Sequence, residues 1–184
     1  MTDPNQQEKA QLLRLEAKFQ QAITANQNND VDRANKLFEE MIKEEPRFPE
    51  ARLEYAFNLL NMERFEEALG QVEEATRLLE IDGAWLDIDA DVILSMAYSL
   101  QGETLRELAG LDENVFRNPE QFTQLMERAK SSFQKAAALD QDNAHAQKWG
   151  FEPSWENPMA QLDQELLNRS IPEEEWLEED SDSD

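Results

Sequence analysis

The chain lacks cysteine and has only one histidine and five glycines among its 184 residues. Without cysteine it forms no disulfide and supports no thiolate chemistry. A lone histidine provides no second imidazole for a metal or nucleophile site, and Gly102 and Gly110 are isolated, so no glycine-rich phosphate loop exists. No apolar run approaches the roughly 20 residues that span a bilayer, and the first residues lack the pattern of a secretory signal. We therefore expect a cytoplasmic protein with no cofactor, no metal and no membrane partner.

Positive charge is also scarce. There are 17 lysines and arginines against 41 aspartates and glutamates, which gives a net charge of −24. Eight of the acids lie in the last twelve residues, so most of the excess is spread over the rest of the chain. Such a surface repels nucleic acid, and we expect none as a partner. Two interpretations stay open: the charge serves solubility alone, or it attracts a basic partner.

What the chain does contain is an internal repeat with a period of 34 residues. Ala34, Phe38 and Met41 recur as Ala68, Val72 and Ala75. A helix, a short turn and a second helix surround each set. One such unit cannot bury its own apolar face, so it must stack on its neighbours. The sequence therefore predicts an all-α fold, a short solenoid of antiparallel helix pairs.

Helix start and stop signals delimit the first two pairs. Asp3-Pro4 and Pro49 are typical helix starts, and Pro46 ends a helix. The predicted helices cover residues 4–27, 31–45, 49–62 and 65–79.

A third pair is predicted with an insertion. Ala97 takes the place of Ala22 and Ala56, while the next small residue of the pattern, expected at position 109, is Ala129. About twenty residues are therefore inserted. Since the inserted stretch keeps a helical pattern and Asn118-Pro119 is a helix start, we expect an elongated hairpin. An ordinary pair followed by a separate small helix is the alternative.

The end of the chain is predicted to cap the solenoid. Two short helices are expected over residues 144–149 and 158–168, and the second has an apolar face suited to covering the exposed end. Residues 171–184 are acidic and without periodicity, so we expect disorder there. The C-terminal segment, with Trp149, Trp155 and Trp176, is also a candidate to fold back onto the binding surface.

The spacing of these small residues resembles the tetratricopeptide repeat family over roughly residues 15–149. The resemblance implies an N-terminal extension (1–14), two repeats (15–48 and 49–82), a third repeat with the insertion (83–143), capping helices (144–170) and the acidic tail (171–184). In this family the first helix of each pair lines a concave groove that holds another protein. Carried over slot by slot, the implied groove residues are Glu16, Phe19, Ile23, Asn26, Glu50, Leu53, Phe57, Leu60, Asn61, Asp91, Leu94 and Tyr98.

Family members that grip the acidic C-terminal tail of heat-shock chaperones do so with lysine, arginine and asparagine. The matching positions here are Phe19, Ile23, Glu54, Asp91 and Ser95, and none of them is cationic. An acidic tail would place like charges together in the groove. We therefore do not expect an acidic chaperone tail as the partner.

Signals for chemistry are weak. His145 is expected on the surface, and adjacent acids such as Glu39-Glu40 point to different sides of a helix. Trp85 is expected to fill the junction between the second and third repeats. The sequence thus favours a non-enzymatic adaptor or chaperone-like protein whose groove binds a basic or amphipathic segment of a partner. The alternative is a self-assembling structural scaffold whose acidity serves only solubility; the sequence does not indicate an oligomeric state.

Overall fold

The computed structural model describes residues 4–151, with side chains from Ala10 onward. The helices of this range are α1 (Pro4–Gln27), α2 (Val31–Glu44), α3 (Pro49–Asn61), α4 (Phe65–Asp82), α5 (Ala90–Ala109), a five-residue π-helix η1 (Glu113–Arg117), α6 (Pro119–Leu139) and α7 (Ala144–Phe151). The expected helix at 158–168 and the expected acidic tail at 171–184 lie outside the described residues.

Local side chains explain where the helices begin and end. The Asp89 carboxylate accepts the backbone N–H of Asp91 and Val92 at 3.0 and 3.1 Å, and Asn118 accepts that of Gln121 at 3.2 Å. These bonds satisfy donors that a helix start leaves free. Helix α4 continues three residues past the predicted end at Leu79, and Gly83 ends it with φ of +76°. Glycine adopts this left-handed backbone without steric cost.

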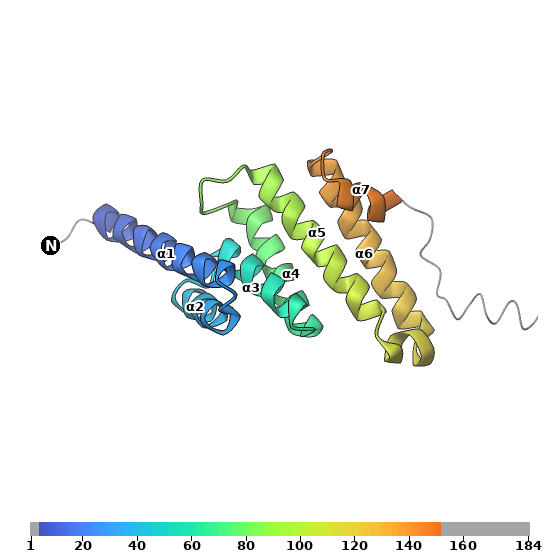
Figure 1. Cartoon of the computed structure of the whole chain (residues 1–184). Helices are drawn as coiled ribbons and strands as arrows, with labels where there is room; N and C mark the ends of the chain where they lie inside the picture. The colour runs from blue at the N-terminus through green and yellow to red at the C-terminus, as the bar shows by residue number, and fades with distance from the viewer. Residues whose placement is uncertain (1–3, 152–184) are drawn as a thin grey trace, which may run out of the picture.

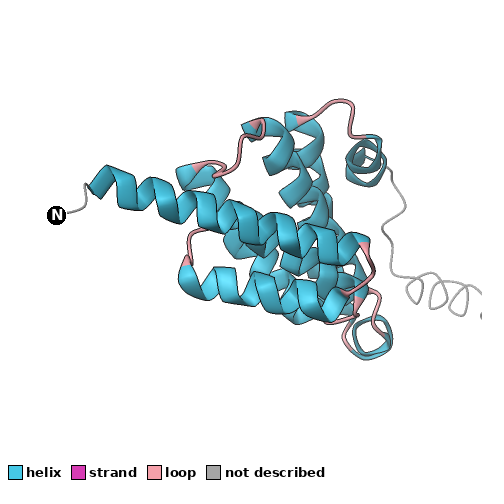
Figure 2. Cartoon of the chain, turned by 60° about the vertical axis from the view of Figure 1, so that its left-hand side comes forward, coloured by secondary structure: helices cyan, strands magenta, loops and turns pink. Residues whose placement is uncertain are grey.

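Each helix packs mainly on the helices next to it in the chain. Helices α1 and α2, α3 and α4, and α5 and α6 form three hairpins, and further contacts join successive hairpins and α3 to α5. Figure 1 shows the hairpins side by side in chain order, and Figures 1 and 2 both show the N-terminal part of α1 projecting beyond the other helices. The predicted fold class, an all-α solenoid of helix pairs, is confirmed.

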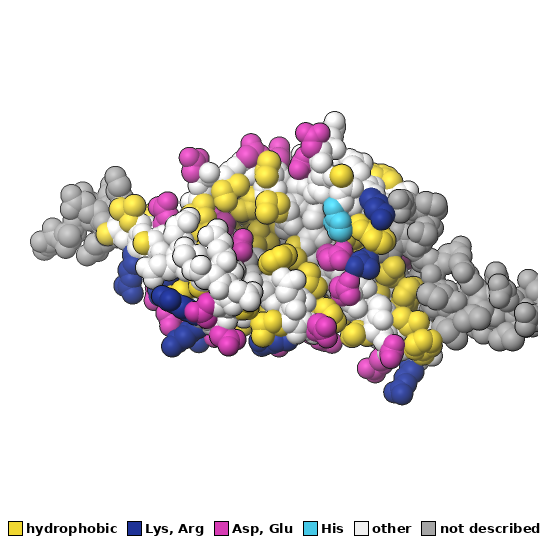
Figure 3. Space-filling view, in the orientation of Figure 1, with side chains coloured by type: hydrophobic (Ala, Val, Ile, Leu, Met, Phe, Trp, Pro, Cys, Tyr) yellow, Lys and Arg dark blue, Asp and Glu magenta, His cyan; other side chains and the backbone are white. Residues whose placement is uncertain are grey.

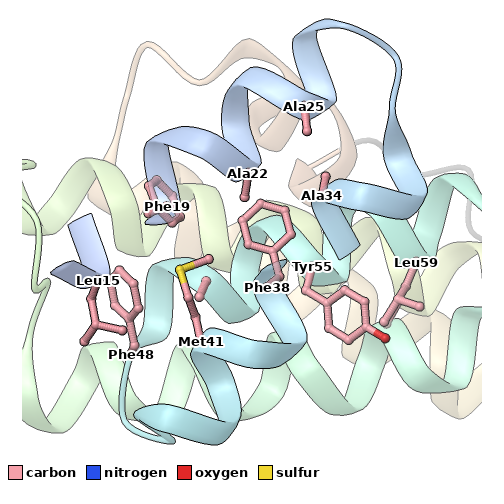
Figure 4. Packing of buried hydrophobic residues seen from close by; sticks show 12 residues of the cluster. Leu15, Phe19, Ala22, Ala25, Ala34, Phe38, Met41, Phe48, Tyr55 and Leu59 are labelled. Atoms are coloured by element: carbon pink, nitrogen blue, oxygen red, sulfur yellow. The ribbon is translucent and has the colours of Figure 1, made fainter. Parts of the chain in front are cut away.

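The repeated small residues lie where the two helices of a hairpin cross. In the first hairpin, Ala22 and Ala34 lie beside the Phe38 ring, and all three are completely buried (Figure 4). In the second hairpin Ala56, Ala68 and Val72 are likewise without exposed surface. Small side chains allow the helix backbones to approach closely enough for these contacts, because interiors are packed without gaps.

The third hairpin crosses at a different residue from the one predicted. A Cβ on Gly102 would lie 2.9 Å from three atoms of the Phe133 ring. Ala97 instead clusters with Leu79 and Ile93, toward the preceding hairpin. Gly102, and not Ala97, is therefore the counterpart of Ala22. The two small residues lie five positions apart, and the inserted segment is shorter by that number than the sequence predicted.

The third hairpin is longer than the second. Helices α5 and α6 have 20 and 21 residues, against 13 and 18 for α3 and α4, and η1 forms the tip. Leu105, Leu108, Phe122 and Leu125 are buried between the long arms, as their apolar spacing predicts. The alternative of an ordinary pair followed by a separate small helix is wrong.

Helix α7 packs on α6 after a polar cap. Asn143 accepts the backbone N–H of Ala146 at 3.0 Å, and its amide donates to the hydroxyls of Ser95 and Ser99 at 3.1 and 2.9 Å. The cap therefore also ties the start of α7 to α5.

The Gly102–Phe133 contact leads to a stability prediction. We expect Gly102→Ala to lower the free energy of unfolding by about 1–3 kcal/mol, because the fully buried Phe133 ring must move to admit a methyl group. Gly70→Ala is the matched control, since it lies in α4 with nothing within 4 Å of its Cβ position. That change should raise stability by up to about 1 kcal/mol through helix propensity. Urea unfolding of both variants measures the difference, and equal behaviour of the two would contradict this crossing.

Candidate functional site

The candidate site is the surface carried by the first helices of the three hairpins, α1, α3 and α5, which we call the groove face. The buried side chains of α3 point toward the other helices, while Phe57 remains 51% exposed. Val92 and Met96 of α5 are 43% and 59% exposed. Figure 3 shows hydrophobic side chains gathered across the middle of the molecule, with acidic side chains among and around them.

The predicted groove residues differ in how much of them a partner can reach. Glu16, Phe57, Asn61 and Asp91 are exposed. Ile23, Asn26, Leu53, Leu60 and Leu94 are half-buried, and Phe19, Glu50 and Tyr98 are buried.

Two of the three buried residues belong to the core. The Phe19 ring lies 6.0 Å from the ring of Phe38 and 5.7 Å from that of Phe48. The Tyr98 hydroxyl donates to Glu80, and the Lys135 ammonium lies 4.8 Å from the Tyr98 ring centre. Phe19 and Tyr98 are therefore corrected from groove residues to core residues.

The shifted crossing at Gly102 also changes which residues of α5 correspond to the groove positions of α3. The counterparts of Glu50, Leu53 and Phe57 become Met96, Ser99 and Glu103. Met96 is thus a groove residue that the sequence reading missed, and counting back from Gly102 rather than from Ala97 would have found it. Leu94 and Leu53 both pack against the cluster of Leu79, Ile93 and Ala97 at the junction between the second and third hairpins.

Glu50, the third buried residue, holds the loop between α4 and α5 against the solenoid. Its Oε1 accepts the backbone N–H of Trp85 at 2.6 Å and of Leu86 at 2.9 Å. Within the described residues its buried Oε2 has no hydrogen-bond partner. Burial raises the pKa of Glu50, although backbone donors, those of Leu86 and Trp85 among them, oppose the shift. The carboxylate is a structural clamp and does not face a partner.

Trp85 lies elsewhere than predicted. Its ring is 5.9 Å from that of Phe48, and it packs against the core cluster shared by the first two hairpins. The residue expected at the junction of the second and third repeats therefore reaches back over the start of α3. The extra loop length after Gly83 makes this possible.

This loop and α1 enclose a cleft of about 290 Å³, which we call the α1–loop cleft. Its apolar walls come from Leu12, Leu15, Phe48, Trp85 and Leu86, and its acidic side chains are Glu16 and Asp87.

An asparagine ladder lies between the first two hairpins. The Asn58 amide donates to the side-chain oxygens of Asn26 at 3.0 Å and of Asn35 at 2.7 Å. The side-chain oxygen of Asn26 therefore already accepts a hydrogen bond within the fold, whereas Asn61 is exposed at the surface.

The positions that the resemblance to tetratricopeptide repeats assigns to gripping an acidic tail contain no cation here. In the register set by Gly102, Met96 and Leu100 replace Asp91 and Ser95 as the third-repeat positions. Glu54 remains at the second-repeat position, and burial raises its pKa. Arg106, nearby on α5, is paired with Glu103 at 2.6 Å and with Glu107.

Evidence for other kinds of site is absent from the described part of the chain. Between residues 10 and 151, no three acidic or histidine side chains come together as a metal site would require. His145 is half-exposed, with its Nε2 atom 3.3 Å from Glu103. None of the helices in that range combines the length and apolar character needed to cross a membrane.

Comparison with known proteins agrees with this architecture. The fold is similar to that of the N-terminal domain of stress-induced protein-1 (STI-1) from C. elegans, with a TM-score of 0.57, 14% identity, and coverage of 75% of this chain and 93% of that one. It is also similar to the first TPR of Spaghetti (RPAP3) bound to the HSP90 peptide SRMEEVD, with a TM-score of 0.56, 15% identity, and coverage of 83% and 93%. Comparison with curated protein sequences gives no match.

These features define an α-solenoid built from helical hairpins. Residues 25–79 match the tetratricopeptide repeat family. This segment of the chain therefore matches the tetratricopeptide repeat pattern that the 34-residue period predicted.

The buried Glu50 carboxyl leads to a pH prediction. Because its pKa is raised in the folded state, Glu50 stabilises the fold most at acid pH, and this contribution is lost as the pH rises through the raised value. Glu50→Gln keeps an oxygen for the two backbone donors and removes the titration. We expect the stability of the variant relative to the natural chain to increase between about pH 4 and pH 7. Chemical denaturation over this range measures the difference, and a constant difference would be inconsistent with a raised pKa.

Proposed function

We propose that this protein is a non-enzymatic adaptor or chaperone-like protein whose groove face binds a basic or amphipathic segment of a partner protein. The observation that carries the proposal is the combination of exposed apolar side chains and acidic surroundings on one face. Exposed apolar side chains that gather on one surface mark interaction sites in soluble proteins.

The apolar part of the groove face supports an amphipathic partner. Phe57, Val92 and Met96 are large, exposed, and carried by two neighbouring first helices. An amphipathic helix inserts its apolar residues into such a surface at helical spacing. Methionine adapts its shape to the residue it meets.

The charge of the groove face supports a basic partner. Glu16 is exposed there, Asp91 is exposed in the first turn of α5, and Arg106 is already neutralised by Glu103 and Glu107. With a net charge of −24 on the whole chain, a basic segment is attracted over a distance and an acidic one is repelled.

The same argument separates this protein from a structural neighbour. The RPAP3 domain is bound to the acidic peptide SRMEEVD. The positions that the family resemblance assigns to tail binding hold Glu54, Met96 and Leu100 in this chain, and Phe19 at another of them is buried in the core. We propose that the groove face rejects such a peptide, since no cation at these positions neutralises its carboxylates.

A second function has its own supporting observation. Phe116 at the hairpin tip and Phe151 at the end of α7 are 60% and 63% exposed, outside the groove face. Contacts between such residues of different copies would make the protein a self-assembling scaffold. Sedimentation equilibrium tests this function. A monomer mass at every protein concentration would exclude self-assembly, whereas an oligomer mass that decreases in the Phe116→Ser variant would support it.

The charge prediction uses defined probes. Two amphipathic helical peptides of about 18 residues, five turns, share leucine positions and carry either lysine or glutamate on the polar face; SRMEEVD is the third probe. We expect only the lysine peptide to bind, with an association rate that falls at least about tenfold between about 50 and 300 mM salt. Stopped-flow fluorescence measures the rate. Equal binding of the lysine and glutamate peptides, or tight binding of SRMEEVD, would refute the proposal.

The location prediction uses matched serine variants. We expect the double variant Phe57→Ser, Met96→Ser to bind the lysine peptide with an affinity at least about tenfold lower, because two exposed apolar side chains that contact the peptide are lost. Ile81→Ser is the control, since Ile81 is 66% exposed but belongs to α4, a second helix. Fluorescence anisotropy gives both affinities. A loss in the control as large as that in the double variant would place binding elsewhere.

A further inference from the structure

The α1–loop cleft is a feature that the repeat pattern does not supply. The loop from Gly83 to Asp89, which joins the second hairpin to the third, has seven residues, whereas only the four residues 45–48 join the first hairpin to the second. The other wall includes Leu12, which precedes the first repeat at residue 15. Two additions to the repeats therefore meet and create a concave site.

We propose that the α1–loop cleft anchors the partner segment by taking one large apolar side chain that is flanked by lysine or arginine. This inference rests on the proposed function and names the contact that would give it specificity.

The cleft is held in shape by the fold. Glu50 fixes the loop through its bonds to the backbone of Trp85 and Leu86. The Trp85 ring lies against Phe48, whose ring in turn lies 5.7 Å from that of Phe19 in the core. A pocket that is formed before binding avoids the cost of ordering its walls.

The size and lining select an apolar side chain. Five of the seven lining residues are apolar, and the volume of about 290 Å³ is at the lower limit of small-molecule pockets. A single leucine, methionine or phenylalanine side chain suits such a space better than a free ligand does. Burial of that side chain supplies the affinity.

The rim selects the neighbours of that side chain. Glu16 and Asp87 are exposed at the cleft, and among the side chains that the structure describes, from Ala10 to Phe151, no lysine or arginine lines it. The cations closest in sequence, Arg14 and Lys18, are engaged with Glu44 of α2 at 3.6 and 2.7 Å. The carboxylates of the rim are thus left to pair with a basic residue of the partner.

The cleft is tested with short probes in the full chain. The first is a capped peptide with the core Lys-Lys-Phe-Lys-Lys; its controls are Lys-Lys-Ala-Lys-Lys and Glu-Glu-Phe-Glu-Glu. NMR of the ¹⁵N-labelled protein reads the indole N–H of Trp85, assigned with Trp85→Phe, and the backbone amide of Leu86. We expect shifts at both sites with the first peptide and none with either control.

Matched leucine variants locate the contact. Leu12→Ser should lower the affinity for the Lys-Lys-Phe-Lys-Lys probe at least about tenfold. Leu13→Ser should not, because Leu13 is 57% exposed on the same helix but does not line the cleft. The double variant Glu16→Gln, Asp87→Asn keeps the apolar walls and should reduce the salt dependence of binding. Equal affinities of the two leucine variants would overturn the inference.

The outcomes distinguish this inference from the proposed function. Shifts confined to Phe57 and Met96 would overturn the cleft and leave the groove face intact. Full binding of the long lysine peptide by the Leu12→Ser chain would do the same. If neither the short nor the long lysine peptide shifts any residue, both the cleft and the proposed function fall.

Discussion

The close crossing of the two helices in each hairpin is the contact on which the rest of this structure depends. Ala22 beside Phe38 and Gly102 beside Phe133 bring backbones near enough for the core to close. Because an aromatic side chain of one helix needs a small residue on the other, each crossing also fixes how a helix is rotated about its axis. That rotation decides which residues of α1, α3 and α5 reach the groove face.

Much of the fold was predictable because it depends on local signals. Proline, aspartate and asparagine at helix starts gave boundaries close to those observed, and the 34-residue period gave the order of hairpins. The rotation of α5 was not predictable, since Ala97 and Gly102 are both small and only the position of the Phe133 ring distinguishes them. An error of five residues there misplaced Tyr98 and overlooked Met96.

The candidate site was harder to predict than the fold for a related reason. Glu50 has the sequence character of an exposed acid, yet a loop of different length from the other turns returns to cover it. Phe19 occupies a groove position of the repeat and is instead drawn between two aromatic rings. A repeat pattern predicts the typical environment of each repeat position. Whether the side chain at that position is buried in one protein depends on the neighbouring loops and side chains that cover it.

The unequal length of the hairpins has a kinetic consequence. Contacts between neighbours in the chain require only short loops to close, and such folds form quickly. The α5–α6 hairpin joins the most extensive of these local contacts to a core of its own around Leu105, Phe122 and Phe133. We therefore expect this segment to become ordered first and to serve as the template on which α4 and then the earlier hairpins assemble, with order propagating from the C-terminal side of the array toward α1.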